Sequence, residues 1–149
     1  MWTDTSGIIG VGYEGRTIEE FVRGLQSWGV STLVDVRLTP LSRKPGFSKK
    51  RLDAALGQVG IEYLHRPSLG NPKDNRAGFG EYDSPSGREA RTKYAEVLDS
   101  DEAKATVAEL AGLAEVTHVA VLCFEASELH CHRKLVLDAV RAALLERTP

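Results

Sequence analysis

Residues 119–133 read Val-Ala-Val-Leu-Cys-Phe-Glu-Ala-Ser-Glu-Leu-His-Cys-His-Arg, and this stretch predicts how the chain folds. Its first four residues form an apolar run of the kind found in buried parallel strands. From about 129 to 146, apolar side chains recur at helical spacing, which is typical of a helix packed on a sheet. The polar cluster between them therefore lies where the carboxyl end of a strand passes into a helix, the usual ligand crevice of open α/β sheets.

The rest of the chain alternates between strand and helix patterns in the same way. Thr17 and Glu20 have the spacing of a capping box, which predicts that a helix begins near Ile18. Ser48 is expected to begin a second helix, and one or two helices are expected over 89–114. The runs that predict strands are 8–11, 32–36, 61–64 and 118–124.

This alternation with short connections predicts a single α/β domain over residues 1–149. We expect an open, mostly parallel sheet of about four strands with helices on both faces, in Rossmann-like layers. The segment 67–87 is rich in Gly, Pro, Asn, Asp and Ser and lacks periodicity. It is predicted to be an irregular loop, either a lid over the site or a disordered segment.

Composition limits the classes of function. The chain has 149 residues, of which 42% are hydrophobic and 27% charged, as in ordinary globular domains. Its net charge of −2 argues against wholesale electrostatic binding of nucleic acid or membranes. No apolar run approaches the roughly 18 residues that span a bilayer, and no signal peptide is evident. We therefore expect a cytoplasmic protein without a membrane partner, whose two cysteines are thiols.

The predicted parallel sheet collects polar residues at one edge, because all of its strand-to-helix loops lie there. Tyr13, Asp35, Arg37 and His65 each stand at or just after the end of a predicted strand, as the polar cluster 123–133 does. A lone histidine such as His65 is more often structural than catalytic. His118 begins its strand and is expected at the opposite edge.

The cluster itself contains residues suited to nucleophilic catalysis. Cys131, His132 and Arg133 are expected in the first turn of the last helix, where the helix dipole and nearby cations favour a thiolate. Either His132 or Glu125 could serve as its base, and Cys123 completes the set. The alternative is architectural, with the cysteines packed in the fold and the charges solvating the start of the helix.

Metal binding is the main rival interpretation of the cluster. Cys123, Glu125, Cys131 and His132 are all legitimate ligands of zinc or iron. Their spacing is not that of a zinc finger or ribbon, and adjacent residues on a helix point about 100° apart. We therefore predict no metal site, while a redox pair of Cys123 and Cys131 stays open.

The glycine pattern Gly10-Val-Gly12-Tyr-Glu-Gly15 matches the dinucleotide-binding fingerprint, and Asp35 falls where a ribose-binding acid is expected. The fingerprint requires a helix that opens on the pyrophosphate, whereas Thr17 begins this helix after the last glycine. A tight turn is the preferred interpretation, and the sequence names no cofactor.

The segment 37–51 is strongly basic and has no acidic residue. Such a surface beside the predicted site suits a phosphate or a nucleic-acid strand. Phe47 could stack on a base or could pack against the second helix. The basic residues are Arg37, Arg43, Lys44, Lys49, Lys50 and Arg51.

Taken together, these motifs resemble the bacterial and archaeal family called domain of unknown function 488. The resemblance implies an α/β fold and singles out the two cysteines, Glu125 and the Cys131-His132-Arg133 triplet, but it implies no reaction. The chain departs from the family pattern at Phe124 and in a shorter loop after Gly70. The matching pieces are 9–13, 17–21, 34–37, Pro40, 42–43, 46–48, 61–63, 69–70, Tyr94, 122–125 and 131–133.

The leading hypothesis is a small enzyme-like domain, a thiol-dependent transferase or hydrolase, that acts on an anionic, phosphate-bearing substrate such as a nucleotide or nucleic acid. The alternatives are a non-catalytic nucleic-acid-binding module and a metal-binding or redox-sensing domain. The oligomeric state is left open. The predicted catalytic residues are Cys131, His132, Glu125 and Cys123. The predicted substrate-binding residues are Arg133, Arg37, Asp35, Tyr13, Arg43, Lys44 and His65.

Overall fold

The protein is a parallel α/β domain in the computed structural model, in which four strands form one sheet in the order β1-β4-β2-β3. The strands are β1 (Gly7–Gly12), β2 (Thr32–Asp35), β3 (Glu62–His65) and β4 (His118–Cys123). The helices are α1 (Ile18–Ser27), α2 (Lys49–Gly57), the short 3-10 helix η1 (Pro67–Leu69), α4 (Pro85–Leu98), α5 (Asp101–Val116) and α6 (Arg133–Arg147). The structure describes residues 3, 6–13, 15–37, 46–70, 85–123 and 133–147.

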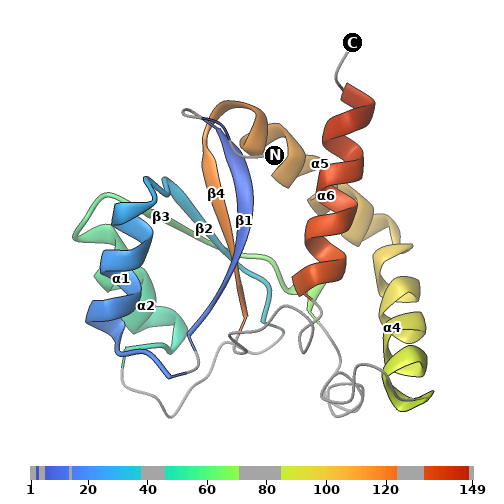
Figure 1. Cartoon of the computed structure of the whole chain (residues 1–149), viewed down its shortest axis with the longest axis horizontal. Helices are drawn as coiled ribbons and strands as arrows, with labels where there is room; N and C mark the ends of the chain where they lie inside the picture. The colour runs from blue at the N-terminus through green and yellow to red at the C-terminus, as the bar shows by residue number, and fades with distance from the viewer. Residues whose placement is uncertain are drawn as a thin grey trace.

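Helices cover both faces of the sheet, as predicted. Figure 1 shows α1 and α2 on one side of the strands and α5 and α6 on the other, with α4 beyond α5. The four strands begin and end within one residue of the predicted bounds. Their strand order, with the last strand β4 placed between β1 and β2, is the feature that the sequence pattern did not contain.

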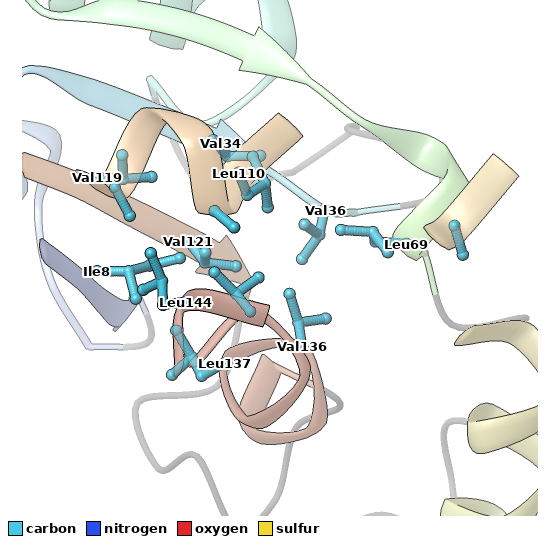
Figure 2. Packing of buried hydrophobic residues seen from close by; sticks show 14 of the residues in the cluster. Ile8, Val34, Val36, Leu69, Leu110, Val119, Val121, Val136, Leu137 and Leu144 are labelled. Atoms are coloured by element: carbon cyan, nitrogen blue, oxygen red, sulfur yellow. The ribbon is translucent and has the colours of Figure 1, made fainter. Parts of the chain in front are cut away.

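The core under α5 and α6 is built from alternate strand residues that face aliphatic side chains of these helices (Figure 2). Alternation along a strand sends every second side chain to the same face, so the neighbouring residues enter the core under α1 and α2. Ala120 and Leu122 belong to that second core, whereas Val119 and Val121 belong to the first. A sheet buried on both faces explains why its strands are continuous apolar runs.

The helix boundaries follow the capping signals. The Glu20 N–H donates to the Thr17 hydroxyl at 3.1 Å and the Thr17 N–H donates to the Glu20 carboxylate at 2.9 Å, which confirms the capping box. Ser48 stands at the N-cap position of α2, as predicted, but its side chain makes no capping hydrogen bond. Gly29 follows α1 with a φ of 71°, a conformation that favours glycine.

The segment 67–87 differs from the predicted irregular loop at both ends. Residues 67–69 form η1, and α4 begins at Pro85. Two hydrogen bonds stabilise η1: the Tyr94 hydroxyl donates to the Leu69 carbonyl at 2.5 Å, and the Ser68 and Thr106 hydroxyls are 2.7 Å apart. Because these contacts join residues that are distant in sequence, the local sequence pattern does not indicate η1. Residues 71–84, which carry most of the lid prediction, lie outside the described residues.

No helix in the described part of the chain is long and apolar enough to cross a membrane.

Candidate functional site

The helix that follows β4 lies on the opposite face of the sheet from the helices that follow its neighbours β1 and β2. The helices α1 and α2, which follow β1 and β2, lie on one face, whereas α5, which precedes β4, and α6, which follows it, lie on the other (Figure 1). Loops that leave neighbouring strand ends toward opposite faces open a crevice at the carboxyl edge. Cys123, the last residue of β4, is paired there with Gly12 of β1.

A buried ion pair lies beside this strand end. Asp35 is paired with Leu122 of β4, and its carboxylate accepts hydrogen bonds from Nε and Nη2 of Arg37 at 2.9 and 2.7 Å. The backbone N–H of Arg37 also donates to Asp35 Oδ1 at 3.0 Å. Asp35 has no exposed surface, and the Arg37 side chain is 8% exposed. Burial lowers the pKa of Arg37, but the hydrogen bonds and charge of Asp35 outweigh it and leave that pKa raised.

The guanidinium group lies over the ring of Tyr13, with Cζ of Arg37 5.3 Å from the ring centroid. Nη1 of Arg37 donates to the Tyr13 hydroxyl at 3.2 Å and to the Phe47 carbonyl at 2.8 Å. The Tyr13 and Phe47 rings are stacked with centroids 4.4 Å apart, and Phe47 meets Phe21 of α1 edge to face at 5.3 Å. Phe47 is fully buried, so the suggestion that it stacks on a nucleic-acid base is wrong. It packs in the core that α2 also enters through Leu52.

Two side chains from β3 complete the network. The Tyr63 hydroxyl donates to Asp35 Oδ2 at 2.5 Å, so the carboxylate accepts four hydrogen bonds in all. His65 Nε2 lies 2.8 Å from the Arg37 carbonyl, and because a carbonyl only accepts, Nε2 carries the proton. Burial raises the pKa of Tyr63, and Asp35 raises it further through its hydrogen bond and charge.

The structure brings four of the predicted site residues together: Tyr13, Asp35, Arg37 and His65. They lie at the carboxyl edge of the sheet, as expected. Tyr63 was missed, because a tyrosine in a strand is typical of simple packing. The alternation of Glu62-Tyr63-Leu64-His65 could have indicated it, since it places Tyr63 on the same face as His65.

Arg37 was predicted to clamp a substrate charge, but its own charge is matched inside the protein. Its guanidinium group makes four hydrogen bonds to internal acceptors, of which two go to Asp35. A group neutralised in this way is better suited to hold neighbouring segments than to attract an anion.

The remaining predicted site residues are Arg43, Lys44, Glu125, Cys131 and His132, and they lie outside the described residues. The backbones of Cys123 and Arg133 are described and mark the two ends of the predicted cluster. Where the structure describes the chain, no group of three or more His, Cys, Asp or Glu side chains could hold a metal ion.

Within the glycine pattern, Gly10 and Gly12 lie in β1, and the tight turn that was preferred over a dinucleotide site falls at Gly15. Gly15 has a φ of 76°, and α1 begins only at Ile18. The capping box occupies the N–H groups of Thr17 and Glu20, two of the donors at the start of the helix where a dinucleotide pyrophosphate would bind. His118 lies at the opposite edge, as expected, with its ring nitrogens 3.1 and 2.8 Å from the carbonyls of Gly29 and Thr3.

Apart from Arg37, the described basic residues of the segment 37–51 lie in the first turn of α2. Lys49, Lys50 and Arg51 are exposed, and the turn has no acidic residue, whereas the first turn of α1 holds Glu19 and Glu20. Cations at a helix N-terminus oppose the helix dipole, so helix stability does not account for them.

Comparison with known proteins identifies the family. The model of the family "Domain of unknown function DUF488" matches residues 17–140. The chain belongs to this family. The match covers the region from α1 into α6, and so includes the buried network apart from Tyr13 and the whole 123–133 cluster of this DUF488 domain. No curated protein and no solved structure matches the chain.

Proposed function

We propose that this DUF488 domain is a small enzyme that acts on an anionic, phosphate-bearing substrate at the carboxyl edge of its sheet. The proposed catalytic residues are Cys131 as the thiolate nucleophile, His132 or Glu125 as its base, and Cys123. Arg133 provides the charge that binds the anion. Arg43 and Lys44 are proposed to contribute further positive charge.

The observation that carries the proposal is the position of β4. It is an interior strand, followed by a helix on the opposite face from the helices that follow its neighbours β1 and β2, and the sequence cluster begins at its last residue, Cys123. Such switch points at the carboxyl edge are where open α/β sheets bind their ligands. The concentration of thiols, carboxylates, imidazoles and a guanidinium in this one connection therefore coincides with the position favoured for a site.

The start of α6 supports the choice of an anion. The described part of α6 begins at Arg133, which follows Cys131 and His132 in the sequence, and the first turn of α6 has no acidic residue. The positive end of a helix dipole and an adjacent cation both lower the pKa of a nearby thiol and favour bound anions. The exposed Lys49, Lys50 and Arg51 of α2 add positive charge at the same edge of the sheet.

The test is the pH dependence of thiol alkylation by iodoacetamide, with the modified residue located by mass spectrometry. We expect Cys131 to titrate below the unperturbed thiol pKa of about 8.5, and pyrophosphate to slow its alkylation. Arg133→Ala should raise the thiol pKa and remove the protection by pyrophosphate. Arg23→Ala removes the same charge from an exposed position on α1 and should change neither.

Three results would contradict the proposal. Two thiols with ordinary reactivity and no protection by pyrophosphate would indicate that the cluster is architectural. Near-stoichiometric zinc or iron in protein purified without chelator would indicate a metal site instead. Salt-dependent binding of DNA or RNA that survives Cys131→Ser, without any thiol of lowered pKa, would favour the non-catalytic nucleic-acid-binding module.

A further inference from the structure

The two inward side chains of β3 each reach past their own partner on β2. Tyr63 is paired in register with Leu33, yet its hydroxyl bonds to Asp35. His65 is paired with Asp35, yet its ring bonds to the carbonyl of Arg37. Both contacts are thus displaced by two residues in the same direction, toward the carboxyl end of β2. They hold the chain at the point where it leaves the sheet.

That point is directly beside the end of β4. The Val36 N–H donates to the Leu122 carbonyl at 3.3 Å, so the pairing of β2 with β4 extends to the residue before Cys123. Arg37 follows Val36 directly, and its Nη1 donates a hydrogen bond to the Phe47 carbonyl at 2.8 Å. The network therefore links the ends of β2 and β3 to the start of α2, next to the strand that leads into the 123–133 cluster.

Stability alone gives a weak reason for such an arrangement. A buried ion pair is often no more stabilising than apolar side chains of the same volume, because desolvation offsets the attraction. What a fully hydrogen-bonded pair does provide is a single geometry. Here the four hydrogen bonds to the Asp35 carboxylate define the direction of the Arg37 side chain and backbone together.

We propose that Tyr63 and His65 are positioning residues of the site, which fix the backbone of residues 35–37 and thereby the strand end beside Cys123. This inference rests on the proposed function, because it assigns to them an effect on the reactivity of Cys131. Neither residue is required to touch the substrate. Tyr63 acts as a hydrogen-bond donor to Asp35, and His65 acts as a donor to Arg37 in the tautomer with the proton on Nε2.

The experiment compares Tyr63→Phe with Tyr94→Phe. Each variant removes one tyrosine hydroxyl that donates a hydrogen bond, to Asp35 in the first case and to the Leu69 carbonyl on the other face in the second. The measured quantities are the pH profile of Cys131 alkylation and the concentration of pyrophosphate that halves its rate. Thermal unfolding of each variant is measured on the same samples.

We expect Tyr63→Phe to weaken protection by pyrophosphate about tenfold, the order expected for the loss of one hydrogen bond to a charged group. Tyr94→Phe should leave protection and pH profile unchanged. A second pair of variants guards against misfolding: His65→Gln keeps an N–H donor and should behave like the wild type, whereas His65→Leu should behave like Tyr63→Phe. Ring nitrogen chemical shifts should show the proton of wild-type His65 on Nε2.

The outcomes separate this inference from the proposed function. A lowered thiol pKa and pyrophosphate protection in the wild type, unchanged in Tyr63→Phe and His65→Leu, would overturn the positioning role and leave the proposed function intact. Equal losses in Tyr63→Phe and Tyr94→Phe would also overturn it, because they would reflect general destabilisation. Ordinary thiol reactivity in the wild type would remove the proposed function and the inference together.

Discussion

The face of the sheet under α5 and α6 is covered mainly by aliphatic side chains, whereas the face under α1 and α2 also contains a buried ion pair and the stacked rings of Tyr13 and Phe47. The first face uses neutral hydrogen bonds such as that from Tyr94 to Leu69. The second uses charged ones centred on Asp35 and Arg37. One sheet thus has a face where burial supplies stability and a face where hydrogen bonds specify geometry.

The largest expected effect comes from breaking the charged face. Asp35→Ala leaves Arg37 buried without its partner and should lower the free energy of unfolding by about 3–5 kcal/mol. The double variant Asp35→Leu with Arg37→Met should recover most of that loss, because it removes both charges. Urea denaturation of the two variants measures the difference. A double variant as unstable as the single one would mean that the pair itself is a main source of stability.

The aliphatic face should respond to lost volume instead. Leu110→Ala removes a fully buried side chain of α5 and should cost about 2–5 kcal/mol, according to how far the cavity collapses. Leu110→Met nearly conserves volume and should cost less than about 1.5 kcal/mol. Equal losses in these two variants, again by urea denaturation, would contradict a core that depends on packing.

A smaller effect is expected at the start of α1, which borders the charged face. Thr17→Ala removes one half of the capping box and should destabilise the protein by about 1 kcal/mol. Thr17→Ser keeps the hydroxyl and serves as the control. Thermal unfolding is sufficient to compare them, and identical midpoints would show that the cap contributes nothing measurable.

The smallest effect is expected from the ion pair of Arg66 and Glu109, whose side chains are 30% and 40% exposed. Its Nε–Oε1 distance is 2.7 Å, and the hydrogen bond from Arg66 lowers the pKa of Glu109 below 4.5. Because the folded pKa is the lower one, the stabilisation is present above 4.5 and is lost as the pH falls through the folded value. Glu109→Gln should therefore cost less than about 1 kcal/mol at neutral pH, and nothing in acid. A difference that grows in acid would contradict this sign.

The sequence predicted the elements better than their arrangement. The apolar runs and the capping box are local signals, and the structure has the four strands and α1 where these signals place them. The order β1-β4-β2-β3 could not be inferred, because interior parallel strands carry the same apolar pattern whatever their neighbours. The common direction of the parallel strands was enough to predict that four residues lie at one edge of the sheet: Tyr13, Asp35, Arg37 and His65.

The internal partners at that edge were harder to predict. Asp35 and Arg37 were both expected near the site, but their mutual neutralisation depends on burial, which is a tertiary property. Phe47 was left between a base-stacking and a packing role, and only its neighbours Tyr13 and Phe21 decide between them. The contribution of Tyr63 requires the register of β3 against β2, which no local pattern contains.

The central position of β4 has a consequence for synthesis of the chain on the ribosome. In the sheet, β4 lies between β1 and β2 and pairs with both, yet it is synthesised long after both of them. A nascent chain that ends before residue 118 can pair β2 with β3, while β1 still lacks its neighbour. Contacts between residues so distant in sequence form slowly, and unpaired apolar strands bind chaperones or aggregate in the meantime. Closure of the sheet is thus a late event, and it creates the edge beside Cys123 in the same step.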